Sequence, residues 1–413
     1  MIRSMYSAVS GLRSHQTMMD VIGNNIANVN THGFKKSQAL FREVLSETVA
    51  GARTPTDGIG GTNPAQIGLG TTINAISQIM EQGALQRTGR ALDVAIDGDG
   101  FFVTEYAGEQ LFTRAGSMYL DADGQLVTTD GALVQGWQAD EFGVVNNATG
   151  VGGILIPVTG EVAPVPTSEI QLGGNLPADS VVGEVVTLNV DVYDQQGLAI
   201  PLALTMTKTA ANEWTTTGTH GDPPTAFNLT DNVLTFDNQG EIVAPADFTI
   251  DIAAGEVPNA SAIQLTVGGP TVASKMSQYG DLTSATVIVQ NGSTTGSLRG
   301  LSVGSDGVLT GSYSNGQVRA LGQIAVANFA NAEGLERVTG SNWRSTANSG
   351  LAQIGVSGFG GRGALASTTL EMSNVDLSEE FTAMIRAQRG FQANSRMITT
   401  SDEMLQEVVN MKR

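Results

Sequence analysis

Residues 2–30, IRSMYSAVSGLRSHQTMMDVIGNNIANVN, decide the fold at the N-terminal end of the chain. Apolar side chains recur there in steps of three and four residues, which is the spacing of one face of an α-helix. One heptad position stays apolar through four repeats, at Met5, Leu12, Met19 and Ile26. The other position begins apolar and then turns polar, at Ile2, Val9, Gln16, Gly23 and Asn30. The pattern predicts a long helix of the coiled-coil type.

The same pattern returns near the C-terminus, from Leu377 onward. Asp376 followed by Glu379 is typical of a helix N-cap with its capping-box partner. A lone amphipathic helix cannot bury such a stripe, so we expect the two ends to pair with each other or with other copies. We therefore predict one helical domain from residues 1–33 and 370–413. Its assembly interface is predicted to comprise Met5, Val9, Leu12, Met19, Ile26, Phe381, Met384, Phe391, Ile398 and Leu405.

The middle of the chain has a different character from the ends. It is rich in glycine, with 51 among the 413 residues, and in turn signals such as Asn315-Gly316. We therefore predict a mainly β protein with α-helical termini and two nested β domains of sandwich or barrel type. An extended linker is expected at 34–70, an inner β domain at 71–145 and 285–369, and an outer acidic β domain at 146–284.

The charge distribution excludes several classes of partner. The formal net charge is −19, and residues 140–285 carry only Lys208 and Lys275 against seventeen acidic side chains. An acidic, self-repelling surface disfavours binding to nucleic acid or to an anionic membrane. No apolar run approaches the ~18 residues that suggest a membrane-spanning helix, and the N-terminal stretch lacks the apolar core of a cleavable signal peptide. We expect neither nucleic-acid binding nor membrane insertion.

Candidates for catalytic or metal chemistry are weak. The chain has no cysteine and three scattered histidines, His15, His32 and His220. The segment beginning at Asp121 resembles a calcium loop, but Gln125 stands at its fifth position and no glutamate stands at its twelfth. The glycine-rich segment 358–363 lacks the Gly-Lys-Ser/Thr ending of a phosphate-binding loop. We predict no catalytic, cofactor-binding or metal site, and no enzyme.

Long multi-residue motifs at both termini, and a shorter one at the entry of the predicted inner β domain, carry a family resemblance. They are Ser7–Arg13, Ile22–Lys35, Ala95–Phe102, Ser373–Phe381, Ile385–Arg396 and Thr399–Leu405. Together they resemble the signatures of bacterial flagellar rod and hook proteins, with family-motif residues Asn24, Asn25, Asn28, Gly33 and Phe34. For the amides of this motif, helix capping and hydrogen bonding between subunits are both open interpretations.

The resemblance implies a structural subunit that is exported through the flagellar type III channel without a cleaved signal. Such a subunit would polymerise outside the cell into a tube lined by its terminal helices. The implied partners are further copies of itself, other axial proteins (rod, hook–filament junction and hook cap) and the flagellar export apparatus.

Size and the acidic insertion favour the hook member of the family, which joins rod to filament and transmits torque, because the rod members are shorter with one β domain. The alternative is a distal rod protein, since the long 50–70 segment resembles an insertion of that protein. An alternative of a different class is a monomeric secreted β-rich adhesin or glycan-active enzyme.

Overall fold

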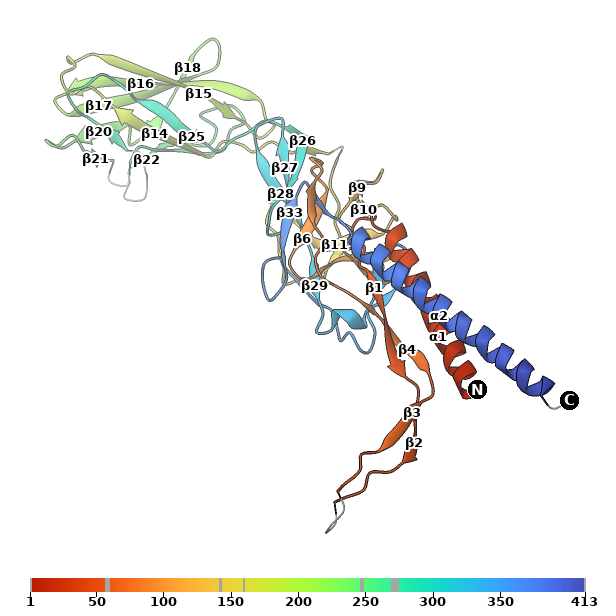
Figure 1. Ribbon diagram of the computed structural model, residues 1–413. Coiled ribbons are helices and arrows are strands. Elements are labelled where there is room, and N and C mark those ends of the chain that lie inside the picture. Colours follow the sequence, from red (N-terminus) through yellow and green to blue (C-terminus); the bar gives the residue numbers. More distant parts are fainter. Residues whose placement is uncertain are drawn as a thin grey trace. The chain divides into compact units, whose positions relative to one another are not determined.

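The computed structural model describes residues 2–55, 60–140, 143–158, 160–245, 249–268 and 275–411. The chain is mainly β with one long helix at each end, as predicted (Figure 1). It divides into two compact units. The first unit comprises Met1–Ile156, Leu301–Thr310 and Arg319–Arg413, and the second comprises Pro157–Gly300 and Gly311–Val318. The limits of the nested domains given above remain a prediction.

The two helices, α1 (Ile2–Ala27) and α2 (Leu377–Asn410), lie side by side in the first unit (Figure 1). They are antiparallel: Gly11 lies against Asn394, and the Asn25 amide reaches Glu380. The helices therefore pair within one chain, which is the first of the two arrangements expected from the heptad pattern.

Residues 34–70, predicted as an extended linker, contain paired strands. Strand β1 (Ser37–Glu43) pairs antiparallel with β4 (Thr71–Gln78), and β2 (Ser46–Ala50) pairs with β3 (Ala65–Gly68). Apolar cross-strand neighbours such as Phe41 and Ile73 explain why this segment forms a ribbon despite its glycines. The ribbon lies along α1, where the Thr71 amide donates to the Ser10 hydroxyl over 3.1 Å.

The remaining strands of the first unit form its β body. In chain order they are β5 (Leu85–Arg87), β6 (Val94–Asp97), β7 (Phe101–Tyr106), β8 (Glu109–Thr113), β9 (Met118–Leu120), β10 (Leu126–Thr128), β11 (Leu133–Gln138), β12 (Gly152–Gly153), β29 (Val326–Asn328), β30 (Glu336–Arg337), β31 (Asn342–Arg344), β32 (Gln353–Gly355), β33 (Ala364–Ser367) and β34 (Thr369–Glu371). A short 3-10 helix spans Ala332–Gly334. The core of this body contains an aromatic cluster in which Phe101 and Phe112 each meet the Phe329 ring edge-on.

Three further strands cross the division between the units: β26 (Gly296–Val303), β27 (Val308–Tyr313) and β28 (Val318–Ile324).

The second unit is a sandwich of two open sheets over one core. Its strands are β13 (Glu161–Val162), β14 (Glu169–Asn175), β15 (Val185–Tyr193), β16 (Ala199–Ala210), β17 (Glu213–His220), β18 (Thr225–Phe227), β19 (Leu229–Thr230), β20 (Val233–Phe236), β21 (Ile242–Ala244), β22 (Thr249–Ile252), β23 (Ile263–Thr266), β24 (Met276–Ser277) and β25 (Thr286–Gln290). One sheet has the order β15-β16-β17-β20-β21, and the other has β19-β22-β23-β14-β24. Leu204 of the first sheet and Leu265 of the second belong to the same buried cluster. Among the described residues the architecture is therefore the sandwich rather than the barrel.

Candidate assembly surface

The seam between α1 and α2 is built from small and polar side chains. A Cβ atom added at Gly11 would lie 2.7 Å from Asn394 Nδ2, and one at Gly390 would lie 2.6 Å from the His15 ring. Each glycine thus makes room for one larger side chain of the opposite helix. The buried side chains of the two helices are Ala8, Ser14, Ile22, Asn25, Glu380, Ala387 and Ser401.

None of the predicted interface residues is among the fully buried side chains of the two helices. Eight of them are half-buried: Met5, Leu12, Met19, Ile26, Met384, Phe391, Ile398 and Leu405. The other two are exposed, Val9 by 37% and Phe381 by 51%. The prediction of these ten side chains as an interface between copies remains open.

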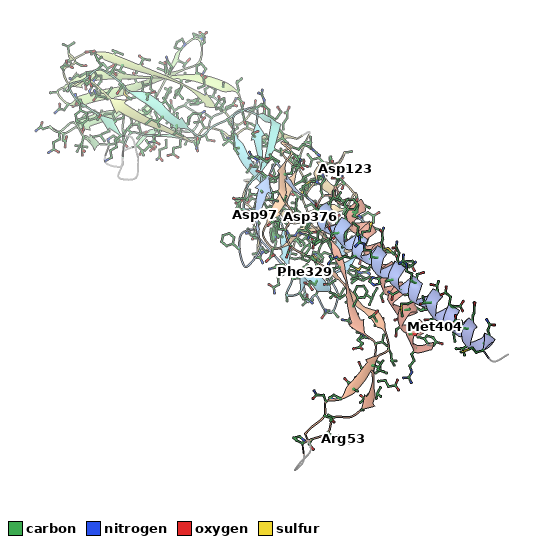
Figure 2. The ribbon with its side chains drawn as sticks, in the orientation of Figure 1. Arg53, Asp97, Asp123, Phe329, Asp376 and Met404 are labelled. Atoms are coloured by element: carbon green, nitrogen blue, oxygen red, sulfur yellow. The ribbon has the colours of Figure 1, made fainter. Side chains whose placement is uncertain are left out.

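Large apolar side chains of α2 stay exposed in two patches. The root patch comprises Leu377, Phe381 and Ile385, which recur every four residues near the start of the helix. The tip patch comprises Met397, Met404 and Val408. Each of these six side chains is between 39% and 51% exposed. Figure 2 shows Asp376 at the beginning of α2 and Met404 toward its C-terminal end.

The charges of α2 are also segregated along its length. Arg386, Arg389 and Arg396 are exposed in the middle of the helix, whereas Asp402, Glu403 and Glu407 are exposed near the tip patch. The first turn, beside the root patch, carries Glu379 and Glu380.

The asparagines of the family motif have separate roles. Asn25 is 1% exposed, and its amide donates to the Ser37 carbonyl over 2.8 Å and to Glu380 Oε2 over 3.3 Å. The Ser37 amide in turn donates to Asn25 Oδ1 over 3.0 Å. Asn28 instead donates to the carbonyl and the side chain of Asn24, both over 2.9 Å, where α1 ends. Asn28 thus caps the helix, while Asn25 joins α1, β1 and α2 within the chain.

Gly33 and Phe34 attach the segment after α1 to the β body. Gly33 has a φ of 69°, and a Cβ there would lie 2.7 Å from the Ala115 nitrogen. Only glycine suits both the conformation and the close approach. Phe34 is buried, and the Arg337 guanidinium lies 4.5 Å from the centre of its ring. Burial lowers the pKa of Arg337.

Asp376 caps α2 as predicted. Its carboxylate accepts hydrogen bonds from the Ser378 amide at 2.7 Å and the Glu379 amide at 3.3 Å, and these bonds lower the pKa of Asp376. Glu379 pairs with Lys36 Nζ at 2.8 Å, and this hydrogen bond raises the pKa of Lys36. Glu379, the predicted capping-box partner, therefore joins the first turn of α2 to Lys36, the residue before β1.

One buried cluster was not anticipated from the sequence. Glu371, Lys35 and Arg114 meet inside the first unit with side chains at most 3% exposed. Two features of the sequence could have indicated this cluster. Glu371 lies just before the motif that begins at Ser373, and Lys35 is the last residue of the motif that begins at Ile22.

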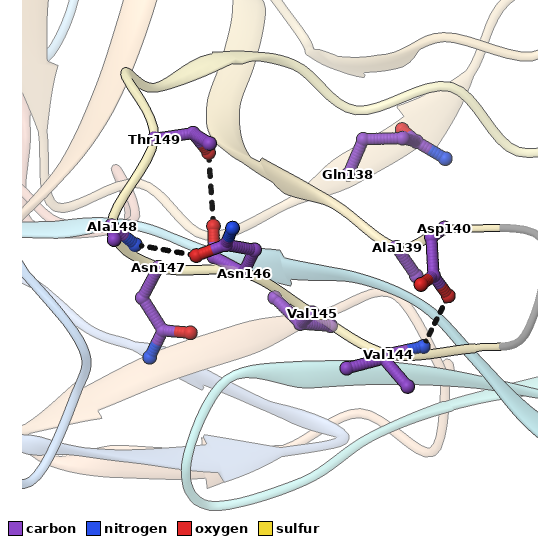
Figure 3. A pocket seen from close by; sticks show the side chains of 9 residues that line it. All are labelled: Gln138, Ala139, Asp140, Val144, Val145, Asn146, Asn147, Ala148 and Thr149. Carbon is purple, nitrogen blue, oxygen red and sulfur yellow. Dashed lines mark hydrogen bonds between the residues drawn. The ribbon is translucent and has the colours of Figure 1, made fainter.

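A surface hollow with a volume of about 670 Å³ lies at the loop after β11 (Figure 3). Its polar groups serve the loop itself: the Val144 amide donates to Asp140, and the Ala148 amide donates to the Asn146 side chain (Figure 3). Asp140 is the one ionisable side chain among its described lining residues. The described part of the chain also holds no group of three or more potential metal ligands. In the same residues, no helix has the length and apolarity needed to cross a membrane.

Four family models match separate parts of the chain, two at its ends and two in its middle. Residues 5–35 match the flagella basal body rod protein model, and 366–411 match the C-terminal model of the flagellar basal body rod FlgEFG proteins. Residues 95–171 match the D1 domain of flagellar hook protein FlgE/F/G, and 177–293 match the D2 domain of flagellar basal body protein FlaE. These matches, with paired terminal helices on a β body, define an axial protein of the bacterial flagellum.

Full-length relatives narrow the class. The flagellar hook protein FlgE of Borreliella burgdorferi is 39% identical over 100% of both chains, and that of Salmonella typhimurium is 34% identical over 99% of this chain and 100% of the relative. The flagellar basal-body rod protein FlgG of Bacillus subtilis is 33% identical over 100% of both chains. The solved structure of Helicobacter pylori hook protein FlgE2 shares the fold, with a TM-score of 0.54 and 14% identity over 70% of this chain and 100% of that chain. The chain belongs to the flagellar hook protein FlgE family, a family of structural subunits of the hook.

Proposed function

We propose that this chain polymerises through its terminal helices into the tube of the flagellar hook, which joins rod to filament and transmits torque. The observation that carries the proposal is the pair of exposed apolar patches on a helix whose seam with α1 is already filled. Fully burying one large apolar side chain contributes about 1.5–3 kcal/mol, so covering the exposed half of each contributes about 1 kcal/mol. Contacts repeated around and along a tube multiply this gain.

The charge segregation on α2 suggests how copies are oriented. The arginines in the middle of α2 complement the acids near the tip patch of another copy. Exposed ion pairs of this kind contribute only about 0–1 kcal/mol each. We therefore propose that they set the register between neighbouring subunits more than they strengthen the binding.

The remaining parts of the proposal rest on family membership. We propose that the subunit contacts the rod, the hook–filament junction proteins and the hook cap, that the flagellar export apparatus carries it outside the cell without a cleaved signal, and that it has no catalytic role, cofactor or metal. The ten interface residues predicted from the heptads are proposed as the flanks of these contacts.

Assembly of the purified full-length chain tests the proposal. In sedimentation and electron microscopy, the unmodified chain should form tubes. The double variant Phe381→Ser/Ile385→Ser should stay monomeric with its helical circular dichroism retained. The matched control Val181→Ser/Val182→Ser removes two exposed valines of the second unit and should still form tubes. Equal polymerisation of both double variants would contradict the role of the root patch.

A distal rod protein remains the second candidate, because the FlgG relative matches over the whole chain and the predicted rod-like insertion contains the paired strands β2 and β3. Straight tubes in place of curved ones would favour this candidate.

A further inference from the structure

Glu371 is a buried carboxylate at the point where both ends of the chain enter the β body. It is the last residue of β34, and its side chain is 0% exposed. Lys35 Nζ lies 2.7 Å from Glu371 Oε1, and Arg114 Nη1 lies 3.4 Å from Oε2. One carboxylate thus faces two cations that are equally shielded from water.

The same carboxylate also organises backbone groups from separate segments. The Gly83 amide donates to Glu371 Oε1 over 2.8 Å, while Lys35 Nζ donates to the Glu81 carbonyl over 2.6 Å. The Gly33 amide donates to the backbone carbonyl of Glu371 over 2.8 Å. Four segments meet here: the turn after α1, the turn before β5, the end of β8 and the end of β34.

A second C-terminal side chain closes the same junction. Asn374 accepts from the Lys36 amide over 2.8 Å and donates to the Ile79 carbonyl over 2.8 Å. The N-terminal turn therefore attaches to the body through groups of the C-terminal segment as well as through Arg337, which donates to the Lys35 carbonyl over 2.9 Å.

The electrostatics make the carboxylate indispensable to this attachment. Burial lowers the pKa of Lys35, and the Glu371 carboxylate opposes that shift. Without Glu371, two buried cations would face each other with only the weaker attraction of Asp99 to offset their repulsion, which is destabilising. Losing Lys35 alone would leave the Arg114–Glu371 pair intact.

We propose that Glu371 is a positioning residue that makes docking of the N-terminal arm, defined as α1 and residues 28–36, conditional on the C-terminal segment. A chain whose last part is absent or unfolded then leaves the arm undocked, so the two helices are aligned only in a complete chain. The link from alignment to tube formation rests on the proposed function, whereas the docking itself does not.

Hydrogen exchange on dilute, monomeric full-length protein tests docking without involving assembly. In Glu371→Gln, amides of residues 2–36 should exchange at least about tenfold faster. Those of β15–β17 in the second unit should be unchanged. The matched control is Glu109→Gln, which removes an exposed partner of Arg344 in the same unit and should leave the arm unaffected.

Lys35→Met covers the case in which Glu371→Gln fails to fold. It removes the attachment to the arm while keeping the Arg114–Glu371 pair, so the arm should again exchange faster while β7 and β8 stay protected. Unchanged exchange of the arm in Lys35→Met would overturn the proposal. Equal loosening of the arm and of β7–β8 would also overturn it, because Glu371 would then be an ordinary core residue. Failure to form tubes with normal arm docking would count against the proposed function instead.

Discussion

At the scale of single residues, Asp376 and Gly33 show how local chemistry fixes the ends of the chain. Asp376 satisfies two amides in the first turn of α2 that have no partner within the helix. Gly33 turns the chain out of α1 with a positive φ and passes close to the backbone near Ala115. Both residues act through the backbone.

The Asp376 cap predicts a pH dependence. Because the folded-state pKa of Asp376 is lowered, its contribution to stability is present above the unfolded value of about 3.9 and is lost as the pH falls through the folded value. Asp376→Ala should lower the thermal midpoint of the first unit at pH 7. Asp376→Asn should keep most of the cap and lose this part of the acid dependence. Identical acid profiles for Asp376→Asn and the unmodified chain would contradict this assignment.

We predict that Gly33→Ala lowers the stability of the chain more than the same substitution at a glycine that is needed only for its positive φ. Gly108 has a φ of 82° with open space where a Cβ would stand, so Gly108→Ala should cost about 1–2 kcal/mol from conformation alone. Gly33→Ala adds a clash with backbone atoms and should cost at least about 1 kcal/mol more. Chemical denaturation measures both values, and equal losses would show that close approach at Gly33 is unimportant.

At the scale of elements, the helix pair is held in register by shape. Gly390 accommodates His15, and Gly11 accommodates Asn394. The two contacts are four residues apart on each helix and run in opposite directions. Sliding one helix along the other would bring larger side chains against these gaps.

Alanine substitutions should distinguish the space that a glycine leaves for the opposite helix from the effect of glycine on helix propensity. Gly23 of α1 has open space at its Cβ position, so Gly23→Ala should stabilise the chain by about 0.8–1 kcal/mol. Gly390→Ala gains the same propensity but meets the His15 ring, so it should be neutral or destabilising. The double variant His15→Ala/Gly390→Ala should recover part of that loss relative to His15→Ala alone. Stabilisation by Gly390→Ala equal to that of Gly23→Ala would exclude a steric register.

At the scale of the whole molecule, each unit has its own core. Trp214 is fully buried in the core of the second unit, and Trp343 is fully buried in that of the first. Separate cores suggest separate unfolding events.

Calorimetry of paired tryptophan variants tests this separation. Trp214→Ala should destabilise the second unit by about 3–5 kcal/mol and leave the other transition in place. Trp343→Ala should do the reverse, and it also frees the Gln78 side chain that accepts from its indole nitrogen over 2.8 Å. A single transition shifted equally by both variants would show that the units unfold together.

The sequence by itself determined the long terminal helices, the Asp376 cap and the β-rich middle, because periodicity, capping and turn chemistry are local properties. It also carried the motif that contains Asn25, Gly33 and Phe34. Only the tertiary structure showed that Gly11 and Gly390 lie in the helix seam, that strands β2 and β3 pair with each other, and that Glu371 joins Lys35 and Arg114. Lys35 and Glu371 are more than 300 residues apart, and so are the two glycines. Contacts of that range depend on which faces pack together after the chain has closed, and no local pattern specifies them.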